Sequence, residues 1–598
     1  MRRGQQDRLS EPGNVSGSES IAVALAGSAA LIVVIAYVGD RLGVAFAPGP
    51  MLAAGIISAA SLLIALGRWA VWEMAETATF AGIVGGTFGW LLWIARPTQF
   101  PLGSGPDLTH HLLLINYIET HWTLVHDFRV QEFLGEMVQY TPGSHILTAL
   151  AGAWSRTNGL HALHGVMAAS AALKAGFVFL IARRVLPRDI PRVPIAALAS
   201  ISLFASQTYF LGSFAEYSFL AQVVAECFAV AMFWTLIAWD QDQSRWAMVV
   251  AGIWGAALFL TWPILIGPPL VVLGLLVILP SPAMVRLITS AKATVVKKPC
   301  PAEADGRRRT DATYVLDVLS KFGDAMVCVV PIAIVAAMFS IGRMDYVVIA
   351  GTGGKVVSPA VTAYGWPFVV LSSAGLLIAA FSLMNRSTRT IALFAGAILL
   401  QAGALYLFAR AHGNDPYMAR KMFYIFLYAQ AVGVAVAVGN LWRAIGADRP
   451  SMRLTAVAWT MTIVAMLFVA RPLAGAPKSL IVAKHPATSL ELEEAGRWTR
   501  EHVDPHCVEY LVGDDDTAYW LHLAALGNPR RGSRTGDNAT YELTPALVRW
   551  LTPGGLPYAI ADLRVIPTDI GDASEVVMQF GRAVIIKRKG PSSCASNP

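Results

Sequence analysis

The residues best suited to chemistry lie in a polar segment that follows a long apolar stretch. Asp107 is followed by His110 and His111, three and four positions further along the chain. A carboxylate at the point where a transmembrane helix leaves the bilayer is costly to desolvate, so it marks a candidate functional site in a membrane protein. If the segment is helical, one or both imidazoles share a face with the carboxylate. The alternatives are an ordinary solvated loop acid and histidines that only sit at a wet interface.

The stretch from His111 to Asp127 is amphipathic and is expected to lie on the bilayer surface as an interfacial helix. A carboxylate held at the level of the lipid headgroups can deprotonate an acceptor hydroxyl while a lipid-borne donor reaches it from the membrane. The pattern therefore favours acid–base chemistry at the membrane surface.

A second candidate is the turn Tyr140-Thr141-Pro142-Gly143-Ser144-His145, which precedes an apolar run too short to cross a bilayer. This pattern indicates a re-entrant or juxtamembrane helix, and such an interrupted backbone is tolerated only against protein or a water-filled cavity. A plain turn into a helix is the alternative. Asp107, His111 and His145 could also bind a divalent metal ion, because imidazole and carboxylate are usual ligands.

A third candidate is the basic segment from Arg410 to Lys421, which also contains Tyr417 and Arg420 and is followed by an aromatic-rich stretch. Cations are unexpected in an outside loop, so they invite an anion. A lipid phosphate or pyrophosphate fits, since Arg offers a bidentate fork and Lys a point charge. The alternative is that these side chains only snorkel at the interface.

The composition predicts a membrane-spanning architecture. The chain has 598 residues, of which 55% are hydrophobic and only 14% charged, and its mean hydropathy is +0.54. These values are typical of an α-helical polytopic membrane protein and not of a soluble globular chain. Much of the net charge of +7 lies in short loops, where Lys and Arg orient a membrane protein. We therefore expect no nucleic-acid partner.

Thirteen transmembrane helices are predicted, at about 21–38, 51–66, 74–95, 160–182, 194–211, 219–239, 246–261, 264–280, 324–341, 365–384, 390–408, 421–439 and 454–470. With the N terminus inside, the basic loops fall on the inner side, as the positive-inside rule requires. These loops contain Arg183-Arg184 with Arg188 and Arg192, the segment Arg286 to Lys321, Arg386 to Arg389, and Arg443 to Arg453. The predicted parts are a cytoplasmic tail 1–20, a transmembrane domain 21–472 with external loop 97–159 and cytoplasmic loop 281–322, and an extracytoplasmic domain 473–598. All three candidate segments then share the outer side.

The polar tail has a separate character. An amphipathic helix near 490–498 and β-like runs at 508–512 and 582–587 predict a small α/β domain. Cys507 and Cys594 both lie in this tail and could pair if it is outside the cell, although nothing in the sequence requires a disulfide.

The order of these features resembles the GT-C superfamily of integral-membrane glycosyltransferases. The acidic catalytic position of that superfamily falls on Asp107, its Tyr-Pro-Pro turn on Tyr140-Thr141-Pro142, and its late basic segment on Tyr417 to Lys421. The tail, with Trp498 to Val503 and Tyr519-Trp520, is similar to the external domains of mycobacterial-type arabinofuranosyltransferases and of uncharacterised GT-C-like membrane proteins. Many GT-C members have a second acid or a second proline where this chain has Leu108 or Gly143.

The resemblance implies a GT-C-like fold and transfer of a sugar from a polyprenyl-phosphate donor at the outer face of the plasma (cell) membrane. The acceptor would be a glycan, lipid or protein of the cell envelope. Asp107 would be the general base, and His110 or His111 would position the acceptor or a metal ion. No nucleotide cofactor is implied, and the divalent metal stays an open question. The implied substrate-binding residues are Tyr140, His145, Arg410, Tyr417, Arg420 and Lys421.

Two other functions compete with this one. A transporter or lipid flippase could use Glu216, Glu226 and the break at Trp262-Pro263 to line a pathway through a helix bundle. A non-catalytic scaffold for envelope assembly could keep the fold while the missing second acid marks lost activity.

Overall fold

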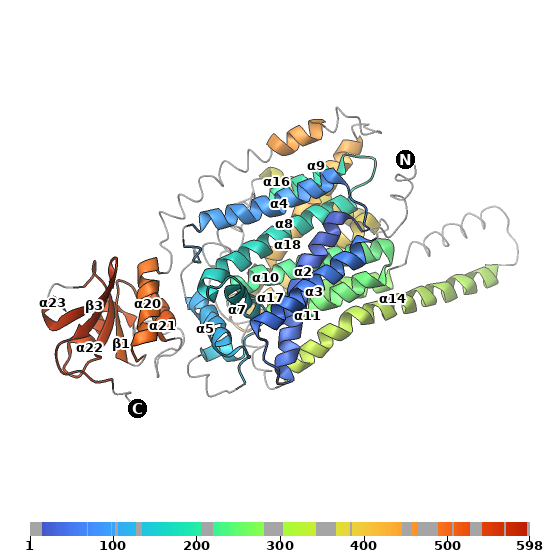
Figure 1. Ribbon diagram of the computed structural model, residues 1–598. Coiled ribbons are helices and arrows are strands. Elements are labelled where there is room, and N and C mark those ends of the chain that lie inside the picture. Colours follow the sequence, from blue (N-terminus) through green and yellow to red (C-terminus); the bar gives the residue numbers. More distant parts are fainter. Residues whose placement is uncertain are drawn as a thin grey trace.

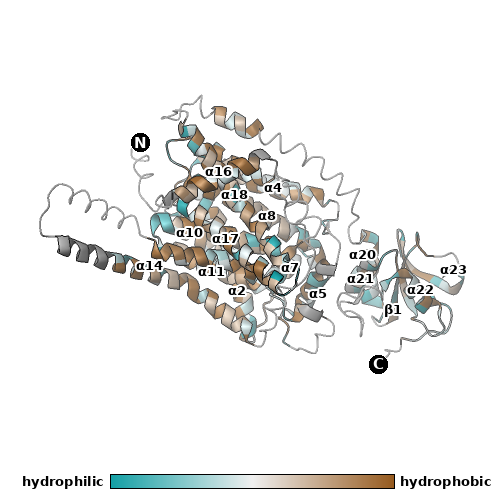
Figure 2. Cartoon of the chain, turned by 180° about the vertical axis from the view of Figure 1, so that it is seen from behind, coloured by the Kyte–Doolittle hydropathy of each residue, from teal (hydrophilic) through white to brown (hydrophobic). Residues whose placement is uncertain are grey.

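The computed structural model describes residues 15–68, 70–96, 98–101, 106–126, 134–204, 219–279, 303–341, 366–382, 386–444, 456–464, 488–504, 507–526, 541–566 and 570–594. Long helices form a bundle, and a small four-stranded sheet with its own helices lies beside the bundle (Figure 1). The bundle helices are largely hydrophobic, whereas the part around the sheet is more hydrophilic (Figure 2). The chain is thus an α-helical polytopic membrane protein with a small C-terminal α/β part, as predicted.

The bundle is built from apolar helices that differ in how deeply they are buried. The apolar window of α10 is 100% buried in the protein and that of α3 only 17%, so α10 is central and α3 faces outward. The bundle helices are α2 (Gly17–Arg41), α3 (Pro48–Gly67), α4 (Met74–Ile94), α8 (Gly159–Val185), α9 (Arg192–Leu203), α10 (Leu220–Asp242), α11 (Arg245–Thr261), α12 (Gly267–Ile278), α14 (Glu303–Ser340), α16 (Trp366–Phe381), α17 (Arg386–Ala411) and α18 (Tyr417–Ala444).

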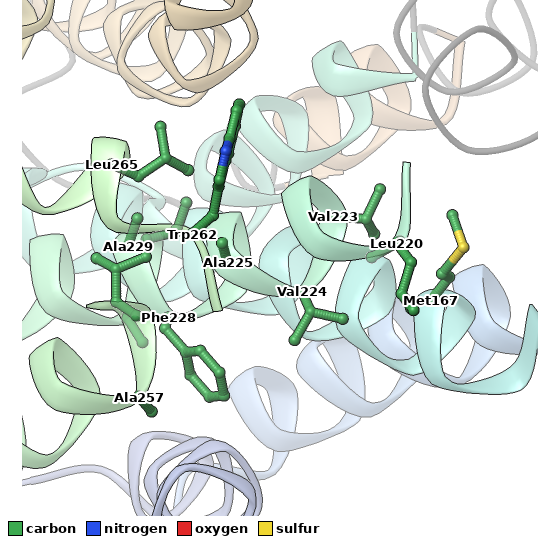
Figure 3. Close-up of a cluster of buried hydrophobic side chains, with 14 of the residues drawn as sticks. Met167, Leu220, Val223, Val224, Ala225, Phe228, Ala229, Ala257, Trp262 and Leu265 are labelled. Atoms are coloured by element: carbon green, nitrogen blue, oxygen red, sulfur yellow. The ribbon is translucent and has the colours of Figure 1, made fainter. Parts of the chain in front are cut away.

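The core around α10 is apolar. The buried side chains drawn in Figure 3 come from α8, α10, α11 and the segment that follows α11. They include Met167, Leu220, Val224, Phe228 and Trp262, all nearly fully buried. Such close packing fixes the helices against one another, and with them the polar groups at the helix ends.

The predicted number of spans is not confirmed. Among the described residues, eight helices are long and apolar enough to cross a membrane, and four more apolar helices are shorter. One of the shorter ones begins at Pro263, which opens a 3-10 turn, η4 (Pro263–Ile266), ahead of α12. The last predicted segment, 454–470, is described only as a helix over 456–464.

The arginines that were predicted to mark inner loops are paired with acids from other helices. Arg184 on α8 donates from Nε to Glu19 on α2 at 2.8 Å and from Nη1 to Asp242 on α10 at 2.6 Å. Arg389 on α17 donates from Nε to Asp240 on α10 at 2.8 Å. These arginines therefore join α2, α8, α10 and α17 at one end of the bundle, in addition to any role in orientation.

The C-terminal sheet has the strand order β1-β2-β4-β3. β1 and β2 are parallel, and β4 is antiparallel to both of its neighbours. Helices lie between β1 and β2 in the sequence, as a parallel connection requires. The strands are β1 (Val508–Leu511), β2 (Tyr558–Asp562), β3 (Ser574–Phe580) and β4 (Ala583–Arg588), and the helices are α20 (Leu490–His502), α21 (Asp515–Leu526), α22 (Leu543–Leu551) and α23 (Ile570–Ala573).

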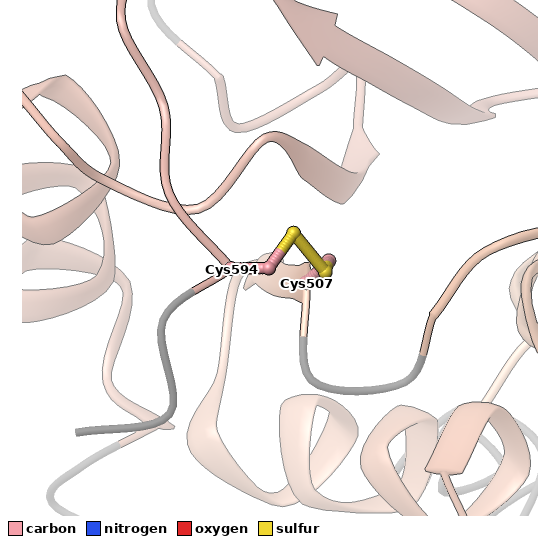
Figure 4. Close-up of a disulfide and its surroundings, with 2 residues drawn as sticks. All are labelled: Cys507 and Cys594. Carbon is pink, nitrogen blue, oxygen red and sulfur yellow. A yellow bond between two sulfur atoms is a disulfide. The ribbon is translucent and has the colours of Figure 1, made fainter. Parts of the chain in front are cut away.

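A disulfide joins Cys507, just before β1, to Cys594, after β4 (Figure 4). The two Cα atoms are 4.7 Å apart, within the usual range for a bridge. The pairing closes a segment of 87 residues that contains the whole sheet. Disulfides persist in oxidising compartments, so this bridge fits the predicted position of the tail outside the cell.

We predict that the double change Cys507→Ser and Cys594→Ser lowers the stability of the C-terminal part by roughly 4 kcal/mol, because the open chain regains the entropy of a long loop. Limited proteolysis of the full chain in detergent, with and without reductant, measures this. Reductant should speed cleavage of the wild type and leave the double variant unchanged. Equal cleavage of oxidised and reduced wild type would contradict the prediction.

Candidate active site

Two short helices between α4 and α8 carry four of the nine predicted site residues: Asp107, His110, His111 and His145. They are α5 (Pro106–His121) and α7 (Gly143–Trp154), joined through the 3-10 turn η2 (Gly135–Val138). At 16 and 12 residues they are shorter than the ~20 residues that a bilayer crossing needs. The prediction of a helix after Asp107 and of a short helix after the Pro-Gly turn is therefore confirmed.

The apolar face of α5 is covered by protein. Leu113, Ile115 and Ile118 are all buried to within 1% of their surface. The helix packs against α7, α8 and α21. The expectation that these side chains insert into the bilayer surface is wrong for the described residues, because an apolar face packs equally well against protein.

The two helices bring an imidazole pair together. Nδ1 of His111 on α5 lies 2.9 Å from Nε2 of His145 on α7. The ring of Tyr140 meets both imidazoles edge-on, with ring centroids 5.3 Å and 5.5 Å away. His110 is also buried. With Asp107, five of the predicted residues lie on or beside this pair of helices, and His111, Tyr140 and His145 are in mutual contact.

The electrostatic surroundings keep His145 neutral. Burial, together with the neighbouring His111, holds the pKa of His145 well below its ordinary value. A neutral imidazole has one donor and one acceptor nitrogen, so it can fix the orientation of the His111 ring through their shared hydrogen bond.

The Pro-Gly turn is fixed against the end of α11. The hydroxyl of Thr141 donates to the carbonyl oxygen of Thr261 at 2.9 Å. A Cβ at position 143 would lie 2.5 Å from Oγ1 of Thr261 and 2.9 Å from the carbonyl oxygen of Leu260. Gly143 is therefore needed for this close approach, and it sets His145 two residues later in the first turn of α7.

Lys421 of α18 also lies near the end of α11. Its Nζ is 3.9 Å from the ring centroid of Phe219, 4.6 Å from that of Tyr417 and 5.2 Å from that of Trp262. These distances place the ammonium group in an aromatic cage held by cation–π attraction. Trp262 directly follows Thr261. The end of α11 therefore links the imidazole pair to the buried cation.

Arg410 and Arg420 lie elsewhere, at a cavity of about 600 Å³ between α17 and α18. Arg420 pairs with Asp415 at 3.0 Å, and the Arg410 guanidinium lies 5.5 Å from the centroid of the Tyr406 ring. The remaining lining is mainly apolar: Leu399, Ala402, Gly403, Leu407, Pro416, Ala419 and Phe423. The structure thus divides the three predicted phosphate-binding cations into two groups, because successive residues of a helix point in different directions.

Asp107 is the second residue of α5, and its side chain lies outside the described part of the structure. Of the three residues of the predicted metal site, only His111 and His145 have described side chains. The facing nitrogens of their imidazoles share a hydrogen bond. No group of three metal-ligating side chains occurs among the residues that the structure describes. The metal site at Asp107, His111 and His145 therefore stays a prediction.

The C-terminal part reaches the helix that carries the predicted catalytic residues. Nη2 of Arg500 on α20 donates to Oδ1 of Asn116 on α5 at 3.4 Å. Burial raises the pKa of the adjacent Glu119 to about 7, against the lowering effects of the Gly159 N–H and of Arg500. The C-terminal part and α5 therefore meet beside a carboxyl group whose pKa is raised toward neutral.

Sequence reasoning missed the cage around Lys421. Phe219 lies 202 residues before Lys421, and it occurs in an apolar run where an aromatic side chain resembles ordinary core. The Trp262-Pro263 break was the available signal. It had been interpreted as a feature of a transport pathway.

No protein-family model and no curated protein matches the chain. Similar solved structures include the archaeal oligosaccharyltransferase AglB from Archaeoglobus fulgidus, in complex with an inhibitory peptide and a dolichol-phosphate. That alignment has a TM-score of 0.42 and 14% identity, and it covers 82% of this chain and 70% of the other. The oligosaccharyltransferase from the same organism in complex with Zn and sulfate is similar at a TM-score of 0.41 and 14% identity, with 81% and 68% covered.

ArnT from Cupriavidus metallidurans, bound to undecaprenyl phosphate, is similar at a TM-score of 0.43 and 14% identity, with 85% of this chain and 97% of that chain covered. These three structures share only distant similarity with this chain. At such TM-scores and identity they carry no argument about chemistry, which rests on the side chains of this chain.

Proposed function

We propose that the chain is a glycosyltransferase that takes a sugar from a polyprenyl-phosphate donor and transfers it to a glycan, lipid or protein of the cell envelope. The observation that carries this proposal is the end of α11, which holds the turn before His145 through the Thr141–Thr261 hydrogen bond and contacts the caged Lys421 through Trp262. One group can orient an acceptor hydroxyl, and the other can hold a leaving phosphate. Acid–base and anion-stabilising groups side by side are what glycosyl transfer from a phosphate requires.

The proposed reaction uses the following steps. Asp107 accepts the proton of the acceptor hydroxyl, whose oxygen attacks the anomeric carbon of the sugar. The bond between that carbon and the phosphate oxygen breaks, and its electron pair leaves with the polyprenyl phosphate. Lys421 stabilises the charge on this phosphate, and His110 or His111 orients the acceptor. Tyr140 and His145 hold His111 in place.

The cavity between α17 and α18 suits the lipid part of the donor. Its walls are apolar, and Arg410 and Arg420 stand where α17 ends and α18 begins. An isoprenoid tail can lie against the apolar walls while the guanidinium groups contact one side of the phosphate and Lys421, the residue after Arg420, contacts the other side. This pairing makes a lipid phosphate the ligand of choice over a free anion.

The proposed location is the plasma membrane, with the site and the C-terminal part on the outer face. The Cys507–Cys594 bridge supports this side for the tail. The transport alternative is less well supported, because Glu226 accepts hydrogen bonds from Lys174, Gln222 and Tyr428.

The donor contact can be tested by binding. Arg420→Gln should weaken binding of polyprenyl phosphate by about 1.5–3 kcal/mol, the usual worth of a hydrogen bond to a charged group. Arg410→Gln should act in the same direction, and the double change should cost less than the sum because both line one cavity. Binding to the purified chain in detergent is measured with labelled lipid.

Arg443→Gln provides a matched control. Arg443 lies near the far end of α18 and, like Arg420, forms a partly exposed ion pair, here with Asp189 at 2.6 Å. The Arg443→Gln variant should bind the lipid like wild type. If Arg420→Gln and Arg443→Gln behave alike, the cavity is not the donor site.

A further inference from the structure

A polar network lies inside the bundle, around Glu226 of α10. Its Oε2 accepts a hydrogen bond from Nζ of Lys174 on α8 at 2.8 Å and another from the Tyr428 hydroxyl on α18 at 2.9 Å. Its Oε1 accepts from Nε2 of Gln222 at 2.9 Å. The side chains of Lys174 and Glu226 are only 3% and 1% exposed. Three helices therefore meet at one carboxylate.

The network and the Lys421 cage lie at two levels of the interface between α10 and α18, and the network is the deeper of the two. Glu226 lies seven residues after Phe219 (226 − 219), and Tyr428 lies seven residues after Lys421 (428 − 421). Seven residues are about two helical turns, or ~10 Å, and they return a side chain to nearly the same face. The contact between Phe219 and Lys421 and the contact between Glu226 and Tyr428 are thus two levels of one packing arrangement.

The contact between Glu226 and Tyr428 fixes the position of α18, and with it the contact between Phe219 and Lys421. A slip or rotation of α18 would withdraw the Tyr428 hydroxyl and leave the buried carboxylate short of a donor, which is unfavourable away from water. Apolar packing alone tolerates small shifts, because one aliphatic contact can replace another. A buried polar network in this place therefore specifies one position of α18, and with it one position of Lys421.

We propose that Glu226, Lys174 and Tyr428 form a positioning network that holds Lys421 at the phosphate of the lipid-linked donor. This inference rests on the proposed function. The network does not touch the donor itself and acts only through α18.

Two variants test it in the full-length protein. Tyr428→Phe keeps the ring and removes one donor to Glu226. The double change Lys174→Met and Glu226→Leu replaces the ion pair by apolar side chains of similar size, which usually leaves stability unchanged or raised. We expect binding of polyprenyl phosphate to weaken roughly fivefold for Tyr428→Phe, the effect of one lost hydrogen bond, and at least as much for the double variant, with thermal stability retained.

Lys421→Met and Gln430→Met complete the design. Lys421→Met removes the proposed phosphate contact, and Gln430→Met changes a buried polar residue of α18 that lies outside the network. If Lys421→Met weakens binding while Tyr428→Phe and the double variant bind like wild type, the network is only structural and the inference is overturned. If Lys421→Met itself binds normally, the proposed donor contact fails instead. Should the double variant not fold, Tyr428→Phe decides.

Discussion

Replacing Arg389 by Met is expected to lower the free energy of unfolding by about 3–5 kcal/mol, the usual cost of removing one partner of a buried ion pair. The side chains of Arg389 and Asp240 are each only 2% exposed. Asp240 also accepts from the hydroxyl of Thr390 at 3.0 Å, but a neutral hydroxyl donor does not balance a buried carboxylate. Denaturant unfolding in detergent micelles measures the change.

Arg443→Met is the matched control. Arg443 and Asp189 form the same kind of two-pronged pair, but their side chains are 48% and 44% exposed. An exposed pair contributes only ~0–1 kcal/mol, so this variant should unfold almost like wild type. Equal losses for the two variants would show that burial does not decide the strength of these pairs.

The ion pairs of Arg184 and Arg389 could not be predicted from the sequence. The positive-inside rule assigned Arg184 and Arg389 to loops that orient the chain, and it takes no account of acids within the helices. Asp240 lies 149 residues before Arg389 in the sequence. No local pattern connects the two, and only the packing of α10 against α17 brings them together.

Asp107→Asn should lower the rate of sugar transfer by a factor on the order of 10²–10⁴, because the change keeps the shape of the side chain and removes the proton acceptor. Binding of polyprenyl phosphate should stay nearly intact, since the proposed donor contacts lie on α17 and α18. The measurement is the initial rate of transfer with wild-type and variant protein at equal concentration. Activity within a few-fold of wild type would remove Asp107 from the role of general base.

Asp572→Asn is a suitable control for this change, because Asp572 is an exposed acid in the C-terminal part. It should transfer sugar at the wild-type rate. A similar loss in both variants would point to a general effect on folding, which the elution profile of the purified proteins would reveal.

The local parts of the candidate site were accessible from the sequence, whereas the contacts between distant parts were not. The spacing of His110 and His111 after Asp107 and the Pro142-Gly143 turn are short-range patterns, and the structure has helices at both places. The hydrogen bond from Thr141 to Thr261 spans 120 residues. Its existence depends on the position of α11, which hydropathy does not specify.

The burial of α5 was mispredicted for a related reason. A run of leucines and isoleucines is equally compatible with a bilayer surface and with a protein core. In this protein α21 and α7 pack against α5, so its apolar side chains belong to the protein core. The same ambiguity explains why the aromatic cage of Lys421 was not foreseen.

The central claim is that this protein makes a glycosidic bond from a lipid-linked donor. The most direct test reconstitutes the wild-type chain in proteoliposomes with a radiolabelled polyprenyl-phosphate sugar and envelope acceptors, then follows the label and the free lipid phosphate. The account predicts a glycosylated acceptor together with one equivalent of released polyprenyl phosphate, both lost in Asp107→Asn. Movement of intact labelled donor across the bilayer, with no glycosylated product, would contradict it.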